Sequence, residues 1–108
     1  MSNTGKPVAR MGDSVATGHA CDTTTKIADN FTPTRVIVEG EPAATVGMNM
    51  EFHTIQGGLA GCIPHMGQIV NAGSAKVLVG GKGIARLGDS ADLGAISTAC
   101  PNGSVLAG

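Results

Sequence analysis

The chain has 108 residues and a net charge of −1, with seven Lys plus Arg against eight Asp plus Glu. This length suits one domain rather than two, so we assign residues 1–108 to a single domain. The sequence shows no basic patch, no apolar signal core and no long apolar run. These features argue against nucleic-acid binding, a cleaved signal peptide and a membrane-spanning helix, and we expect a chain made in the cytoplasm.

The apolar residues of the chain are mostly small. Hydrophobic residues make up 42% of the sequence but aromatic residues only 2%, namely Phe31 and Phe52. Large aromatic side chains supply much of the buried area of small domains, and chains of this size are marginally stable. We therefore expect an additional source of stability, which could be a metal ion, a partner surface or both.

Short apolar, β-branched segments separated by Gly, Ser, Thr, Asn and Pro predict an all-β fold. In chain order, the strands with the strongest apolar character cover residues 36–38, 76–79 and 104–107. Residues 91–96 are the only candidate for a helical turn. Short strands joined by glycine turns are therefore the expected architecture.

The sequence also contains an internal repeat. Residues 6–14, 41–49 and 82–90 share the order charged, Pro or Gly, apolar, Ala, polar, apolar, Gly. The second and third copies follow a strand and a tight glycine turn, at Gly40 and at Gly80-Gly81, which is the signature of a β-hairpin. Because a single hairpin is marginal in water, the copies must pack on one another. Residues 102–108 look like the first strand of a further unit, cut off at its turn.

All histidines and cysteines lie in the segments between these repeats. If the hairpins pack around a common axis, the connecting segments converge at one end, where their side chains can form a closed tetrahedral site for zinc. The alternative is that the histidines are solvated and that the cysteines are three reduced thiols, because an odd count excludes a complete disulfide framework within one chain. The residues concerned are His19, Cys21, His53, Cys62, His65 and Cys100.

The repeats resemble those of PAAR-repeat proteins, which are named for Pro-Ala-Ala-Arg and continue with Gly-Asp. The three copies in this chain read Pro7-Val8-Ala9-Arg10 with Gly12-Asp13, Pro42-Ala43-Ala44-Thr45 with Gly47, and Gly83-Ile84-Ala85-Arg86 with Gly88-Asp89. The similarity covers essentially the whole chain. The second copy departs from the pattern, with Thr45 in place of Arg and Asn49 in place of Asp.

The resemblance implies a small cone of three β-hairpins seated on the trimeric β-helical spike of a type VI secretion system or a contractile phage tail, one cap per trimer. It also implies a structural zinc ion near the apex, bound by three histidines and one cysteine. His19, His53 and His65 are the three histidines of the chain. We assign Cys100 as the fourth ligand, with Cys62 as the alternative because it neighbours His65, and Cys21 as the least suitable.

The function implied by the resemblance is mechanical. Such a protein caps and sharpens the spike, contacts the target membrane transiently as it pierces the envelope, and leaves the cell through the machine without a signal peptide. We expect no catalysis, because four protein ligands leave no position for a substrate and the sequence has no His-Glu-x-x-His motif. The alternatives are a free-standing zinc-stabilised binding module and an adaptor for effector cargo.

Overall fold

The structure is a computed structural model that describes residues 5–28, 36–100 and 105–108. Residues 101–104, which include part of the predicted last strand, lie outside this range. The described residues form short strands and one 3-10 turn, which confirms the all-β prediction. The elements are β1 (Lys6–Pro7), β2 (Ser14–Ala16), β3 (Thr24–Lys26), β4 (Ile37–Val38), β5 (Glu41–Pro42), β6 (His53–Gln56), η1 (Gly58–Ala60), β7 (Cys62–His65), β8 (Leu78–Val79), β9 (Lys82–Gly83), β10 (Ser90–Ala91), β11 (Gly94–Ile96) and β12 (Leu106–Ala107).

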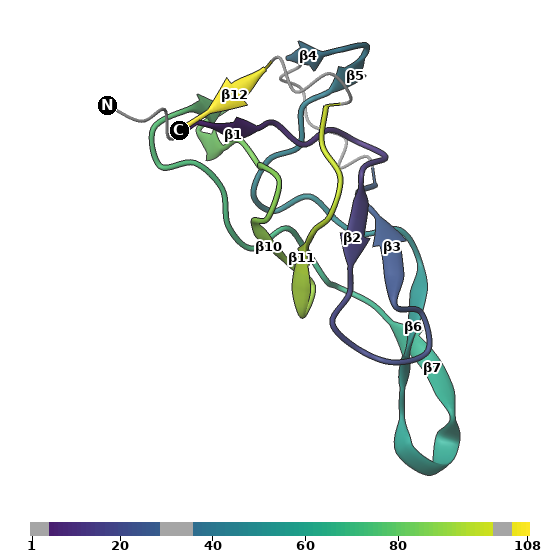
Figure 1. Cartoon of the computed structure of the whole chain (residues 1–108). Helices are drawn as coiled ribbons and strands as arrows, with labels where there is room; N and C mark the ends of the chain where they lie inside the picture. The colour runs from purple at the N-terminus through teal and green to yellow at the C-terminus, as the bar shows by residue number, and fades with distance from the viewer. Residues whose placement is uncertain (1–4, 29–35, 101–104) are drawn as a thin grey trace.

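The molecule is elongated and tapers. Figure 1 shows β1, β4, β5 and β12 at the broad end and the β6–β7 hairpin at the narrow end. Between the two ends, β10, β11, β2 and β3 pair in that order as a four-stranded sheet. In the described part of the chain, no helix is both long and apolar enough to cross a membrane.

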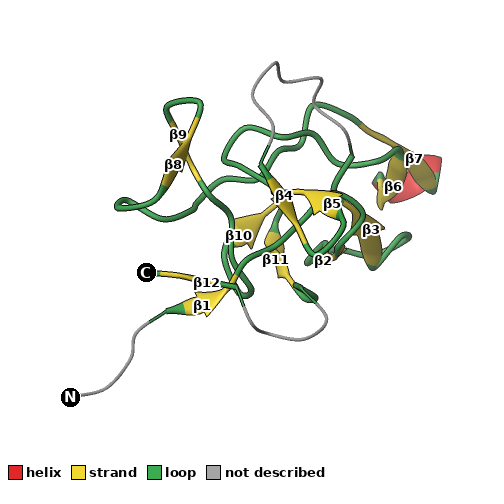
Figure 2. Cartoon of the chain, turned by 90° about the horizontal axis from the view of Figure 1, so that it is seen from above, coloured by secondary structure: helices red, strands yellow, loops and turns green. Residues whose placement is uncertain are grey.

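Three equivalent hairpins build the broad end (Figures 1 and 2). β4 pairs with β5 and β8 with β9, as the repeat predicts. The third hairpin is made from the two ends of the described chain, because β12 pairs with β1. Lys6 lies opposite Ala107 in the register in which Glu41 lies opposite Val38. The last strand is thus the first strand of the first repeat rather than the start of a further unit.

A ring of three alanines closes the repeats around a pseudo-three-fold axis. Ala9, Ala44 and Ala85 occupy the same repeat position, and each has no exposed surface. The N–H of Ala9 donates to the carbonyl of Ala85 at 2.9 Å, that of Ala85 to Ala44 at 2.8 Å, and that of Ala44 to Ala9 at 2.9 Å. Such a cycle brings three backbones together, so only small side chains can be accommodated around the axis.

We expect Ala44→Leu to destabilise the fold strongly. Three extra carbon atoms beside the axis must displace the neighbouring backbones, and overpacking of a well-packed core costs about 1–3 kcal/mol or more. Urea unfolding followed by circular dichroism measures this loss. Ala75→Leu is the matched control, because Ala75 is exposed and surface changes stay within about 0.5 kcal/mol. Equal urea midpoints for the two variants would contradict the closed ring.

Two clusters of buried side chains form the core, and neither contains an aromatic residue in the described part of the chain. One lies around the alanine ring and the four-stranded sheet, and the other lies among the hairpins of the broad end. The first comprises Ala9, Val15, Ile27, Ala44, Met48, Met50, Val70, Ala85, Ala91 and Ile96. The second comprises Val8, Val38, Ala43, Ile84, Cys100 and Ala107. The core is made of small groups, as the composition predicts.

The Arg and Asp of the repeat act as a pair. Asp89 accepts hydrogen bonds from the Arg86 side chain at 2.9 and 3.0 Å, and this contact raises the pKa of Arg86. The residue of the second repeat that corresponds to Asp89 is Met48 and not Asn49. The N–H of Met48 donates to the carbonyl of Thr45, just as the N–H of Asp89 donates to the carbonyl of Arg86. Both charged partners are therefore replaced together, and Met48 joins the apolar core at 1% exposure.

Candidate metal centre

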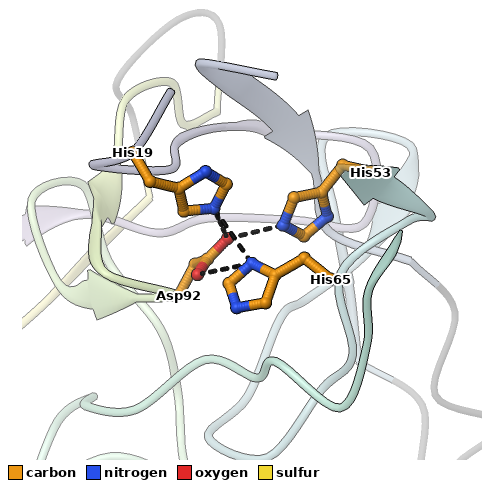
Figure 3. A group of neighbouring side chains, drawn as sticks. All are labelled: His19, His53, His65 and Asp92. Carbon is orange, nitrogen blue, oxygen red and sulfur yellow. Dashed lines mark hydrogen bonds and ion pairs between the residues drawn. The ribbon is translucent and has the colours of Figure 1, made fainter. Parts of the chain in front are cut away.

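The segments between the hairpins converge on one cluster of metal-binding side chains, as the sequence predicts. His19 comes from the loop between β2 and β3, His53 from the start of β6, His65 from the end of β7, and Asp92 from the turn between β10 and β11. Figure 3 shows the four side chains pointing toward one another. One ligand atom from each residue lies within 4.8 Å of the other three.

The carboxylate of Asp92 lies at the middle of the cluster. Its Oδ2 atom is 2.7 Å from Nε2 of His53 and 3.1 Å from Nε2 of His19, and its Oδ1 atom is 3.5 Å from Nδ1 of His65. Nδ1 of His65 also lies 3.0 Å from Nε2 of His19. In a tetrahedral zinc site with bonds of about 2.0–2.1 Å, ligand atoms are roughly 3.4 Å apart. The four residues are thus close enough together to hold one metal ion.

Backbone carbonyls orient two of the imidazole rings. Nδ1 of His53 is 2.8 Å from the carbonyl of Glu51, and Nδ1 of His19 is 3.1 Å from that of Ala20. With a proton on each Nδ1, these carbonyls accept hydrogen bonds, and the Nε2 lone pairs would be available to a metal ion at the centre of the cluster. Metal-bound histidines in proteins are held in the same way.

Strand pairing sets the positions of His53 and His65, which lie directly opposite each other in the β6–β7 register. The loop that carries His19 is closed by Thr17, whose hydroxyl donates to the carbonyl of Asp22 at 2.7 Å. Gly18 has φ +80°, and a Cβ atom there would lie 2.4 Å from the carbonyl oxygen of Leu93. A glycine is therefore required before His19, so that this loop can approach the Asp92 turn.

Residues 91–96 do not form the helical turn that the sequence suggested. They form the β10–β11 hairpin, whose turn contains Asp92 at φ +55°. Asp tolerates this left-handed conformation better than most residues do. The Asn71 side chain donates to the Asp92 carbonyl at 3.0 Å, and the Asp92 N–H donates to Ile69 at 3.1 Å. These bonds hold the turn against the histidines.

The donor set can hold a metal ion. The side chain of Asp92 has no exposed surface, and its Oδ1 atom has no hydrogen-bond partner within the described residues. A buried carboxylate without a cation is costly, and a bound metal ion would neutralise it while using the three ring nitrogens. The histidine side chains are between 3% and 14% exposed, so the four residues enclose the centre.

The three cysteines lie outside this donor set. Cys100, assigned as the fourth ligand from the sequence, is buried in the second cluster, where its N–H donates to Val8 and its thiol to Val105. The reason is that β11 carries the chain from Asp92 back toward the broad end before Cys100 is reached. Asp92 was not predicted as a ligand from the sequence, although it lies in the same inter-hairpin segment as Cys100 and a carboxylate is an ordinary zinc ligand.

Cys21 and Cys62 form a disulfide bond, so the expectation of three reduced thiols is wrong. The thiolate is the form of cysteine that binds a metal ion, so the disulfide bond also removes Cys62 as the alternative ligand. The bond ties the His19 loop to β7. A second tie lies beside it, because the N–H of Thr54 donates to Asp22 at 2.7 Å and its hydroxyl donates at 3.0 Å. These hydrogen bonds lower the pKa of Asp22.

No protein-family model matches the chain, and no curated protein is significantly similar to it.

Proposed function

We propose that this chain is a structural tip protein that caps the trimeric β-helical spike of a contractile injection system, of the phage-tail or type VI secretion kind. The observation that carries the proposal is the pseudo-three-fold broad end, in which one chain presents three equivalent hairpins. A trimer ends in three identical surfaces, and one chain with three similar faces can contact all of them at once.

The exposed apolar residues of the broad end support this partner. Leu106, Ile37 and Leu78 occupy the same position in β12, β4 and β8, opposite Pro7, Pro42 and Gly83. They are 44%, 58% and 57% exposed. Large apolar side chains exposed at equivalent positions mark an interaction surface, and their three-fold disposition suits a three-fold partner.

We propose zinc as the ion of the metal centre and a structural role for it. Three imidazole nitrogens and one carboxylate oxygen suit zinc, and four protein ligands leave no position for water or a substrate. The ion would fix the segments that lead to the narrow end. Disulfides persist in oxidising environments, so the Cys21–Cys62 bond suits a protein that works outside the cytoplasm.

Binding to a trimeric β-helical spike tests the proposal. We expect one chain per spike trimer in size-exclusion chromatography with light scattering. The triple variant Ile37→Asp, Leu78→Asp, Leu106→Asp should bind about 1,000-fold more weakly or worse, because burying each side chain contributes about 1.5–3 kcal/mol.

Leu59→Asp is the matched control, since Leu59 lies in η1 at the narrow end, and it should bind the spike like the unchanged protein. Absence of the complex, or equal binding by the triple variant, would overturn the cap. A free-standing zinc-stabilised module or a cargo adaptor would then be the better description.

A further inference from the structure

We infer that the turn of the β6–β7 hairpin is a docking surface for a lipid bilayer. The inference deepens the proposed function and rests on it, because it names the part of the tip that meets the target. It stands on three observations: the position of the hairpin, its exposed apolar side chains, and the absence of charged residues from the hairpin's own sequence.

The hairpin is the narrow end of the molecule. In Figure 1 it extends beyond the loops that carry the metal centre and ends in η1. Leu59, in the middle of η1, is 110% exposed, so its whole side chain is in solvent. Its neighbours from Gly57 to Gly61 are otherwise glycines and an alanine. The tip therefore consists of backbone with small or no side chains and one large apolar side chain.

Further apolar side chains follow along the same hairpin. Ile63 is 38% exposed and packs over Gly57, where an added Cβ would lie 2.8 Å from its Cδ1. At the base, Phe52 and Met66 are 73% and 74% exposed and line one recess of about 400 Å³. A four-residue strand spans about 13 Å. Burial of the tip by about 5–10 Å, as for interfacial segments, would thus leave the base near the headgroups.

The hairpin itself carries no charged side chain. Charged groups lie near its base, where Asp22 is hydrogen-bonded to Thr54 and where Glu51 lines the recess beside Phe52. Residues 52–75 contain no Asp, Glu, Lys or Arg, although the chain as a whole has seven basic and eight acidic residues. Moving a charged side chain into a bilayer is costly, and this hairpin has none to move.

Some backbone polar groups of the turn form hydrogen bonds within the turn itself. The N–H groups of Gly57 and Gly61 donate to the carbonyls of Gly61 and Gly58, at 2.6 and 3.1 Å, and the Gln56 side chain donates to Gly58 at 3.1 Å. Backbone groups paired in this way reduce the cost of entering an apolar phase.

A bilayer suits this surface better than a protein does. Stable protein interfaces bury about 800 Å² on each partner, and a single projecting leucine with a few flanking side chains offers much less. Without a basic residue in the hairpin, its turn has no means of selecting anionic lipids. We therefore expect weak, reversible binding that zwitterionic lipids support and that salt does not reduce.

Tryptophan fluorescence tests the inference directly, because the chain has no Trp or Tyr. The probe is vesicles of phosphatidylcholine, added at millimolar lipid to the metal-loaded, oxidised protein. Leu59→Trp should show a blue-shifted emission on addition of vesicles and quenching by brominated lipid, at both low and high salt. Leu78→Trp is the matched control at the broad end and should show neither change.

Flotation with the same vesicles gives a second readout. Leu59→Asp should lower the bound fraction by about tenfold or more, because one buried leucine contributes at least that factor. No shift with Leu59→Trp, an equal shift with Leu78→Trp, or binding that requires anionic lipid and low salt would overturn the inference. A shift that depends on protein concentration alone would indicate contact with a second copy and would also overturn it.

The two proposals can fail separately. Leu59→Asp should bind the spike trimer normally, and the triple variant of the broad end should bind vesicles normally. Loss of vesicle binding in the broad-end variant would assign the membrane surface to the other end of the molecule.

Discussion

Removal of the metal ion should lower the melting temperature of the protein by about 15–30 °C. A ligand that binds only the folded state at 1,000 times its dissociation constant contributes about 4 kcal/mol, and each kcal/mol shifts the midpoint of a domain of this size by about 4–8 °C. The reason for the dependence is that His19, His53, His65 and Asp92 come from three separate segments, and neither buried apolar cluster includes a residue of β6 or β7. Metal analysis should give one zinc ion per chain, and thermal unfolding followed by circular dichroism with and without a chelator measures the shift.

Two variants locate the effect. Asp92→Asn retains the shape of the side chain and a residue that tolerates the left-handed turn, but it removes the charge, so we expect the ion to be lost to a competing chelator. Cys100→Ala is the matched control and should retain one ion per chain, because Cys100 lies in the second apolar cluster. Equal melting temperatures for metal-loaded wild type and Asp92→Asn would show that the four residues form a hydrogen-bonded network and are not stabilised by a metal ion. Loss of the ion in Cys100→Ala would restore that cysteine as a ligand.

Removal of the disulfide should cost about 4 kcal/mol of folding stability. Cys21 and Cys62 are 41 residues apart in sequence, and cross-linking a loop of that length restricts the unfolded chain by about this amount. The double variant Cys21→Ser, Cys62→Ser should therefore unfold at a lower urea concentration, with the metal content held constant. The comparison is made in urea because the midpoint and slope together give the free energy of unfolding.

A reducing agent provides the control for this experiment. It should destabilise the unchanged protein by a similar amount and should leave the double variant unaffected, since the remaining cysteine, Cys100, is not part of a disulfide bond. Unchanged stability of the wild type after complete reduction would show that the bond does not restrain the unfolded chain. Mass spectrometry before and after reduction and alkylation confirms how many thiols were released.

The repeat is recognisable from the sequence because it depends on local chemistry. Each copy places a glycine where the chain must turn and an alanine where three backbones meet, and these requirements recur at fixed positions. Gly40, Gly80 and Gly81 all have positive φ, as the tight turns require. The convergence of the three histidines also followed from the sequence, because hairpins that pack around one axis send their connecting segments to one end.

The remaining features depended on which segments meet in space. The pairing of β12 with β1 joins the two ends of the described chain, so no local pattern could show that the last strand completes the first repeat. The fourth residue of the metal centre was decided by the direction of β11, which leaves Asp92 with the histidines and carries Cys100 to the opposite end. The Cys21–Cys62 bond was likewise decided by the approach of the His19 loop to β7.

The sequence by itself therefore determined the all-β class, the three hairpin units and the three histidines, because turns and strand patterns are properties of neighbouring residues. The tertiary structure alone decided the closure of the ring, the position of Asp92 beside the histidines, and which cysteines pair. Those depend on distances between residues far apart in the chain, and such distances are set by how the hairpins pack rather than by any local preference.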